Sequence, residues 1–271
     1  CIMNRNDILI EADELLKKIH NKNIRIFDAS IVDDMYQQGH IPGAAYFDHA
    51  KFSDPNKAYE YMLLPDEELA AQIGNVGISN DTEVVVYACG MLPYAARAWW
   101  VLRYAGHNNV RVLNGGLSAW KNAGGTVEQA PRQYEPAVFH PQFNPGMFAD
   151  KEEVMEALKD SEISVVDVLP PESYEGAHIT GSTCLSAMDL MQGLDYFLPD
   201  DKLALRLQEK AGYKRIITYC GGGIAAVINA MAHLMVGQEN VAVYDGSLYE
   251  WMGEGLPITG TGKWEIWKQP A

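Results

Sequence analysis

The chain has 271 residues, 48% hydrophobic and 21% charged, as in an ordinary globular protein with one large or two average domains. Its net charge of −15 and pI of about 4.8 argue against nucleic acid and anionic membranes as partners, because both repel an acidic surface. The numbered residues contain no apolar run that could span a membrane and no signal peptide.

Predicted strands and helices alternate along the first part of the chain. Residues 11–21 carry apolar side chains at helical spacing, and residues 24–27 and 84–87 are short apolar runs typical of buried strands. Residues 95–106 read as a helix that ends at Gly106. This alternation predicts an α/β fold with a mostly parallel sheet and helices on both faces.

An internal repeat indicates two domains of this kind. Residues 24–47 resemble 163–185, and residues 82–106 resemble 214–237, with equivalent positions 131 to 139 residues apart. A period this long indicates a duplicated domain rather than a solenoid unit. The interval 128–148 contains four prolines and no clear periodicity, which is typical of a linker. We therefore predict an N-terminal domain (1–130), a linker (131–145) and a C-terminal domain (146–271).

The four cysteines are Cys1, Cys89, Cys184 and Cys220. None forms a C-x-x-C pair or lies near histidines at zinc-finger spacing, so we predict no structural metal, disulfide framework or cofactor. Because the first residue is Cys1, the chain is either trimmed or a mature form with a lipid-modified cysteine. The compartment therefore stays open, with a cytoplasmic location favoured over a periplasmic or lipid-anchored one.

Cys220 has the surroundings of a reactive thiol. The predicted strand 215–219 ends directly before it, three glycines follow, and a predicted helix occupies 224–235. Ligands of parallel sheets bind at the carboxyl ends of strands. Glycine amides and a helix N-terminus at this place form a concavity that stabilises a thiolate without a cationic side chain. The alternative is a buried cysteine before an ordinary glycine turn.

The two halves together with four short motifs resemble the two-domain rhodanese family of thiosulfate and 3-mercaptopyruvate sulfurtransferases. The motifs are GHIPGA (39–44), VLNGGLSAW (112–120), CGGGIAA (220–226) and YDGSLYEW (244–251). The resemblance implies two tandem rhodanese-like domains, the first non-catalytic and packed over the site. It also implies that the enzyme needs no cofactor and moves sulfur from a small-molecule or protein donor to a thiol or cyanide acceptor.

The resemblance further implies a role for each residue of the Cys220 loop, which we define as residues 220–225. Cys220 would be the nucleophile that carries the sulfur as a persulfide. The residues whose amides would cradle the substrate sulfur are Gly221, Gly222, Gly223, Ile224 and Ala225.

The sequence departs from the family where anionic donors are bound. The thiosulfate enzymes have Arg and Lys where Gly221 and Gly222 stand, and the mercaptopyruvate enzymes have Ser and Thr where Gly222 and Ala225 stand. Leu169 and Ser173 occupy the two positions at which family arginines grip a sulfonate or carboxylate. With a net charge of −10 on residues 136–271, we expect a neutral or bulkier sulfur donor.

Alternatives remain at the sequence level. Cys89 and His40 are secondary catalytic candidates, although packing suits Cys89 and a turn hydrogen bond suits His40 and its repeat equivalent His178. Arg97 reads as a structural or interface residue, and Asp245 is expected near the loop. Cys184, Trp120 and Trp251 suit the core, although Trp251, Trp264 and Trp267 together could wall an apolar pocket.

Two other functions were weighed against sulfur transfer. A Cys-x5-Arg phosphatase is excluded, because Ala226 stands where its phosphate-binding arginine would be. A catalytically weak rhodanese-like binding or regulatory module remains the alternative function. The absent arginines favour it, while the retained cysteine and glycines oppose it.

Overall fold

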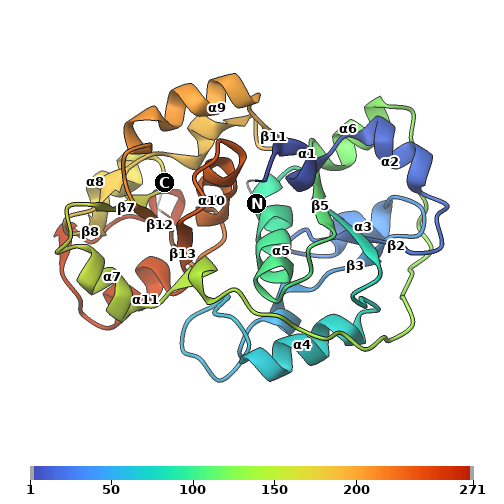
Figure 1. The fold of residues 1–271 in the computed structure, drawn as a ribbon, viewed down its shortest axis with the longest axis horizontal. Helices are drawn as coiled ribbons and strands as arrows, with labels where there is room; N and C mark the ends of the chain where they lie inside the picture. Colours follow the sequence, from blue (N-terminus) through green and yellow to red (C-terminus); the bar gives the residue numbers. More distant parts are fainter. Residues whose placement is uncertain (1–2, 269–271) are drawn as a thin grey trace.

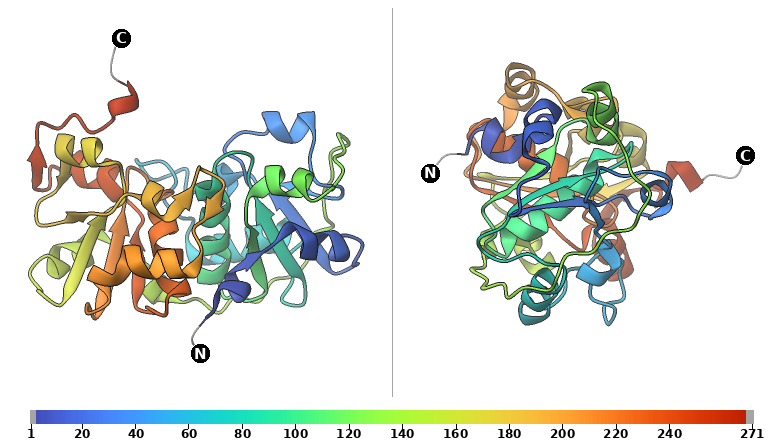
Figure 2. Two further views of the ribbon diagram at one scale, coloured as in Figure 1. Left: turned by 90° about the horizontal axis from the view of Figure 1, so that it is seen from above. Right: turned by 90° about the vertical axis from the view of Figure 1, so that its right-hand side faces the viewer.

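A computed structural model describes residues 3–268, and Cys1 lies outside them. Two five-stranded parallel sheets lie side by side, each with helices on both faces (Figures 1 and 2). Their strand orders are equivalent, β1-β5-β4-β2-β3 and β6-β13-β12-β7-β9. The predicted α/β class with two tandem rhodanese-like domains is confirmed, and the repeat in the sequence is a repeat in the fold.

The first sheet is formed by the short apolar runs of the first half. Its strands are β1 (Leu9–Ile10), β2 (Ile24–Asp28), β3 (Ala45–Tyr46), β4 (Glu83–Tyr87) and β5 (Val110–Leu113). The sheet is accompanied by α1 (Arg5–Ile8), α2 (Ala12–Lys18), α3 (Asp34–Gln38), α4 (Asp66–Asn75), α5 (Leu92–Tyr104), α6 (Gly116–Asn122) and the 3-10 turn η1 (His49–Phe52). Gly106 follows α5 with a φ of 96°, a left-handed conformation that suits glycine and ends the helix as predicted.

The second sheet repeats this plan. Its strands are β6 (Phe148–Ala149), β7 (Ile163–Asp167), β9 (Thr183–Cys184), β12 (Arg215–Tyr219) and β13 (Val241–Tyr244). Its helices are α7 (Lys151–Ala157), α8 (Pro171–Gly176), α9 (Asp200–Leu207), α10 (Ala226–Met235) and α11 (Ser247–Gly253). The short 3-10 turns are η2 (Pro145–Met147), η3 (Ala187–Leu190), η4 (Gln208–Lys210) and η5 (Ile266–Lys268). Two small antiparallel pairs complete it, β10 (Met191–Gln192) with β11 (Tyr196–Phe197) and β8 (Ala177–Ile179) with β14 (Ile258–Gly260).

The two halves meet along α5 and α10, which lie next to each other at the centre of Figure 1. Between α6 and η2 the chain crosses the first half without a helix or ladder strand, as a linker would. It is anchored there by Tyr134, whose hydroxyl accepts a hydrogen bond from the Ile26 amide at 2.8 Å and donates one to the Gly43 carbonyl at 2.8 Å. The exact limits predicted for the domains, 1–130 and 146–271, stay a prediction.

Each half also extends one arm over the other. The first-half arm, residues 53–63, is closed by a bridge between Ser53 and Leu63 and reaches toward α11 (Figure 1). The second-half arm, residues 191–197, is the β10–β11 hairpin, and it reaches the end of the first sheet. The two arms follow η1 and η3, which occupy equivalent places in the repeat.

Candidate active site

Cys220 lies directly after the central strand β12 of the second sheet, at its carboxyl end, as predicted. Its residue is 2% exposed. The Cys220 amide donates to Ser247 Oγ at 3.1 Å, and that hydroxyl donates to the Tyr244 carbonyl at 2.8 Å. The Leu248 amide donates to the Cys220 carbonyl at 3.0 Å. The start of α11 therefore fixes the backbone from which the thiol projects.

The sulfur of Cys220 accepts a hydrogen bond from the Gly223 amide, with 3.1 Å between the two atoms. Gly223 has a φ of 84°, a conformation that glycine adopts without the steric cost of a side chain. Among residues 3–268 this amide is the one donor to the sulfur. Several converging amides were predicted, and the structure shows one. Helix α10 begins three residues later and adds the positive end of its dipole.

Aromatic rings cover the first two glycines of the loop. A Cβ placed on Gly221 would lie 2.7 Å from the Trp264 ring, and one on Gly222 would lie 3.3 Å from Tyr61 and 3.4 Å from Tyr249. The side chains that relatives of the thiosulfate type carry at these positions would have to displace these rings. Glycine suits this loop for two reasons: the aromatic rings pack directly against its backbone, and Gly223 has a positive φ.

Two phenols lie near the thiol. Burial raises the pKa of Tyr94, and the charge of the Cys220 thiolate raises it further. Burial also raises the pKa of Tyr249 to about 12, helped by Glu265, to which its hydroxyl donates at 3.1 Å. Both phenols are therefore neutral O–H groups at physiological pH. Sequence reasoning missed Tyr61, Tyr94 and Tyr249, which come from three separate segments.

The expected tryptophan wall is only partly present. Trp264 is buried beside Gly221, and Trp267 contacts its ring edge-on but is itself 57% exposed. Trp251 is buried in the core, where its indole N–H donates to the Pro257 carbonyl at 2.9 Å. Trp251 is therefore a packing residue and not part of a pocket wall.

One guanidinium does approach the loop, which corrects the expectation that no cationic side chain is nearby. Arg97 on α5 is buried between the halves, and its Nη1 lies 2.7 Å from Asp245 Oδ1 and 3.3 Å from the Gly223 carbonyl. The sequence prediction of an interface residue is confirmed. Because Asp245 matches its charge at hydrogen-bonding distance, Arg97 adds little free positive charge for a substrate anion.

The positions of the two absent arginines are filled by buried, uncharged side chains. Leu169 belongs to the hydrophobic core, and Ser173 is fully buried at the start of α8. Neither can bind a sulfonate or carboxylate through a charged hydrogen bond. These two positions therefore supply no positive charge.

Cys89, the secondary candidate, lies in a different environment. Its thiol donates to Asp28 Oδ2 at 3.6 Å, and its amide donates to Ser30 Oγ at 2.9 Å. Burial, followed by the charge of Asp28, raises the pKa of Cys89 to about 12. A thiol with that pKa is a poor nucleophile at neutral pH, so the packing role expected for Cys89 is supported. Burial likewise raises the pKa of Cys184 to about 11.

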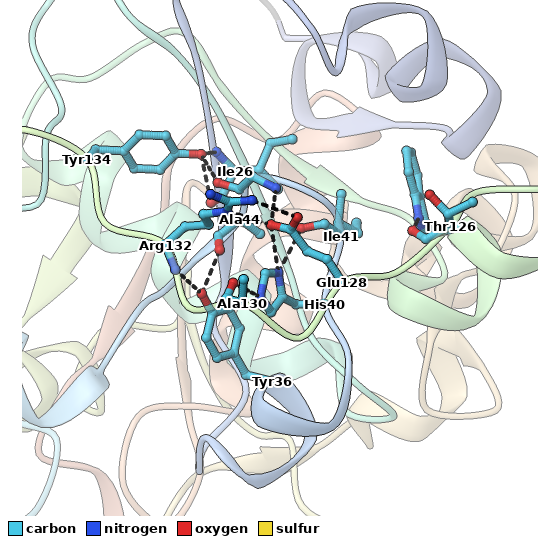
Figure 3. Close-up of polar contacts among 12 residues, drawn as sticks. Ile26, Tyr36, His40, Ile41, Ala44, Thr126, Glu128, Ala130, Arg132 and Tyr134 are labelled. Atoms are coloured by element: carbon cyan, nitrogen blue, oxygen red, sulfur yellow. Dashed lines mark hydrogen bonds and ion pairs between the residues drawn. The ribbon is translucent and has the colours of Figure 1, made fainter.

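His40 lies among hydrogen-bonded residues of the first half, with Tyr36, Glu128 and Ala130 around it (Figure 3). Its Nδ1 lies 2.9 Å from the Ile41 carbonyl and its Nε2 lies 2.8 Å from the Ala130 carbonyl, while its ring stacks on Tyr36. Its equivalent His178 stacks on Tyr174 in the same manner. Both ring nitrogens of His40 lie at hydrogen-bonding distance from backbone carbonyls, which supports the turn role expected for this residue.

Two further findings limit the chemistry within residues 3–268. No three His, Cys, Asp or Glu side chains are grouped so as to hold a metal ion. None of the helices in that range combines the length and the apolarity that crossing a bilayer requires.

Comparison with known proteins identifies the family. The profile described as "Rhodanese-like domain" matches residues 11–123 and 150–254. The chain is 35% identical to thiosulfate sulfurtransferase of Mus musculus over 83% of this chain and 81% of that protein. It is 29% identical to thiosulfate/3-mercaptopyruvate sulfurtransferase 2 of Arabidopsis thaliana, over 96% and 88% of the two chains.

Solved structures agree with this assignment. SseA from Escherichia coli, a 3-mercaptopyruvate sulfotransferase, superposes with a TM-score of 0.81 at 28% identity, over 88% of this chain and 98% of that one. EanB in complex with ergothioneine superposes with a TM-score of 0.85 at 22% identity, over 95% and 71%, which shows a shared fold. The chain therefore belongs to the rhodanese-like family and is a two-domain sulfurtransferase.

Proposed function

We propose that Cys220 carries sulfur as a persulfide between a sulfur donor and a thiol or cyanide acceptor, and that the first domain is not itself catalytic. The observation that carries this proposal is the 3.1 Å hydrogen bond from the Gly223 amide to the Cys220 sulfur at the end of β12. A sulfur that accepts from an amide in this way is stabilised as a thiolate, the form that attacks sulfur. Gly221, Gly222, Gly223, Ile224 and Ala225 would line the site of the transferred sulfur.

The transfer balances without an added oxidant or reductant. The Cys220 thiolate attacks the terminal sulfur of a donor R–S–S⁻, a new S–S bond forms, and the donor's S–S bond breaks. The electron pair of that bond leaves with the thiolate R–S⁻. An acceptor thiolate then attacks the outer sulfur of the Cys220 persulfide. The acceptor departs as a persulfide, and Cys220 is left as a thiolate.

The surroundings of the loop favour a neutral or larger donor over thiosulfate or 3-mercaptopyruvate. Leu169 and Ser173 provide no charge, and the guanidinium of Arg97 is paired with Asp245. The groups near the sulfur are instead aromatic rings and the neutral phenols of Tyr94 and Tyr249. A small dianion would lose its hydration without gaining an ionic partner. A bulkier organic persulfide, whose organic group can contact the rings, fits these surroundings better.

The proposal is tested by intact mass spectrometry after exposure to four donors, namely thiosulfate, 3-mercaptopyruvate, inorganic polysulfide and glutathione persulfide. We expect the mass of one sulfur atom to be gained most readily with glutathione persulfide, located at Cys220 by peptide mapping and absent in Cys220→Ser. Robust loading and turnover with thiosulfate or 3-mercaptopyruvate would refute the donor preference. No gain of sulfur with any of the four would refute the persulfide function and leave the binding module.

A further inference from the structure

The Arg97–Asp245 pair lies between the two halves, and neither charge is exposed. Arg97 comes from α5 of the first half and is 3% exposed, while Asp245 directly follows β13 of the second half. Burying two charges is unfavourable unless every remaining donor and acceptor also finds a partner. The further partners of this pair therefore indicate what its position requires.

Those partners are the Cys220 loop and the first-half arm. The guanidinium of Arg97 donates to the carbonyl of Gly223 at 3.3 Å and to the carbonyl of Tyr61 through Nη2. The second carboxylate oxygen of Asp245 accepts from the Leu63 amide at 2.8 Å. One ion pair thus holds a residue of the sulfur-binding loop and two residues of the arm that covers it.

The contact with Gly223 reaches the sulfur through one residue. Arg97 holds the carbonyl of Gly223, and the amide of the same residue donates to the Cys220 sulfur at 3.1 Å. Gly223 has no side chain to fix its backbone, and its φ of 84° lies in a region that glycine leaves easily. An external contact on its carbonyl therefore restricts the direction in which its amide points.

The contact with Tyr61 fixes the cover of the loop. Tyr61 has a φ of 66°, which is unusual for a residue with a bulky side chain and persists only when neighbours stabilise it. Its ring lies over Gly222, where an added Cβ would be 3.3 Å from it. The bond from Arg97 to its carbonyl and the Ser53–Leu63 bridge hold the arm in this conformation.

We propose that Arg97 is a positioning residue for sulfur transfer: through Gly223 and Tyr61 it aligns the amide that binds the Cys220 sulfur and closes the first-half arm over it. The first domain then has a defined part in the chemistry although its own loop is inactive. This inference deepens the persulfide function proposed above. It names the side chain through which docking of one half controls the thiol of the other.

The test compares full-length Arg97→Lys and Arg97→Met with wild type and with Arg103→Met. Lysine keeps the buried charge, but its compact ammonium lacks the planar fork that reaches Asp245, Gly223 and Tyr61 together. Arg103 lies on the same helix and contacts the Asn108 carbonyl and the Trp99 ring, away from the loop, so its variant is the matched control. Asp245→Asn provides an independent disruption of the same pair.

Two readouts are measured, the rate of sulfur loading from glutathione persulfide and the pH profile of Cys220 alkylation by iodoacetamide. We expect Arg97→Lys to load sulfur about tenfold more slowly, because a small misplacement of a binding group has a large effect on rate. The midpoint of its alkylation profile should move to higher pH as the Gly223 amide turns away. Its limiting rate at high pH should rise as the arm opens.

The outcomes separate this inference from the proposed function. A wild-type protein that gains no sulfur would refute the proposed function. Alkylation requires no sulfur donor, so its pH profile tests the position of the Gly223 amide in that case as well. Wild-type loading together with equal loading and an unchanged midpoint in Arg97→Lys would overturn the positioning role. If Arg97→Met does not fold, Arg97→Lys and Asp245→Asn still give the decision.

Discussion

The Cys89 loop, residues 88–92, and the Cys220 loop occupy equivalent places in two copies of one fold. Their sulfur atoms nevertheless take opposite roles in hydrogen bonds. The thiol of Cys89 donates to Asp28, whereas the sulfur of Cys220 accepts from the Gly223 amide. A thiol that donates to a carboxylate is held as the neutral form, and one that accepts from an amide is favoured as the anion. The difference arises because Cys89 stands one position further from its strand than Cys220 does from β12.

The arms repeat this contrast. The second-half arm closes on the Cys89 loop through backbone contacts, with Leu194 accepting from Leu92 at 2.8 Å and Asp195 accepting from Gly115 at 2.9 Å. The first-half arm instead brings Tyr61 over the Cys220 loop and is held by Arg97. The second-half arm thus binds the first half through backbone hydrogen bonds and the Tyr196 ring, whereas the first-half arm places the Tyr61 ring over Gly222. The two halves therefore share a scaffold and differ in the register of the cysteine and in the arm that contacts each loop.

The sharpest way to break this comparison is to remove each cysteine in turn. Cys220→Ser is expected to abolish sulfur transfer, a fall on the order of a thousandfold or more, since no second nucleophile is available. Cys89→Ser should retain activity within about twofold, because it loses only a weak hydrogen bond to Asp28. Steady-state transfer from glutathione persulfide to a thiol measures both. Comparable losses in the two variants would show that the halves share the chemistry.

The second prediction concerns native alkylation of the three described cysteines at pH 8. With pKa values raised to about 12 and about 11, Cys89 and Cys184 expose a thiolate fraction on the order of one in a thousand or less. We therefore expect iodoacetamide to modify Cys220 before Cys89 and Cys184. Peptide mapping at short times gives the order, and alkylation in denaturant supplies the control in which all three react alike. Preferential labelling of Cys89 would contradict the assignment.

A third test targets the packing of Trp264 on the Cys220 loop. In Gly221→Ala the added Cβ would lie 2.7 Å from the Trp264 ring, so we expect a loss of about 1–3 kcal/mol in the free energy of unfolding and slower sulfur loading. Trp264→Leu in the same chain should restore much of the loading rate, because it returns the space. Gly212→Ala is the matched control, since nothing lies within 4 Å of its added Cβ. Equal effects of the two glycine variants would exclude the aromatic contact as the cause.

The residues local to the repeat were predictable from sequence, and those brought by docking were not. The strand ending before Cys220, the glycine turn and the following helix all depend on neighbours in the chain, so their pattern is visible in the sequence. The arms could not be foreseen, because Tyr61 reaches the loop only through the packing of one half on the other. Trp264, in the same half as the loop, was among the residues predicted to wall a pocket, and it does lie beside Gly221.

The contacts of Arg97 were also only partly predictable from the sequence. Its sequence surroundings indicate only a helix with a buried charge, and an interface role followed from that. Its partner Asp245 was expected near the loop because it ends the strand beside β12. That these two charges would meet, and that the guanidinium would also reach Gly223, depends on the relative placement of two domains. No periodicity within either half contains that information.

The smallest expected effect is a pH-dependent difference in stability between variants of two equivalent buried carboxyls, Asp28 and Asp167. Asp28 Oδ2 accepts from the Cys89 thiol, whereas Asp167 Oδ2 has no hydrogen-bond partner among residues 3–268, a consequence of the different cysteine register. Burial raises the pKa of both, and that of Asp167 to about 6. A carboxyl whose folded pKa exceeds its unfolded value of about 3.9 contributes stability below that value, which is lost as the pH rises through the folded pKa.

Asp167→Asn mimics the protonated carboxyl at every pH. The stability of the variant relative to wild type should therefore increase as the pH rises from 4 to 7. We expect the difference in the free energy of unfolding between the two to grow by about 2 kcal/mol over this range, given the pKa of about 6. Denaturant unfolding at several pH values measures it. Asp28→Asn should give a smaller change: both carboxylates accept from an amide at 2.9 Å, Ser30 for Asp28 and Leu169 for Asp167, but only Asp28 also accepts from a cysteine thiol. Equal pH slopes for the two variants would mean that the cysteine register does not distinguish the environments of these carboxyls.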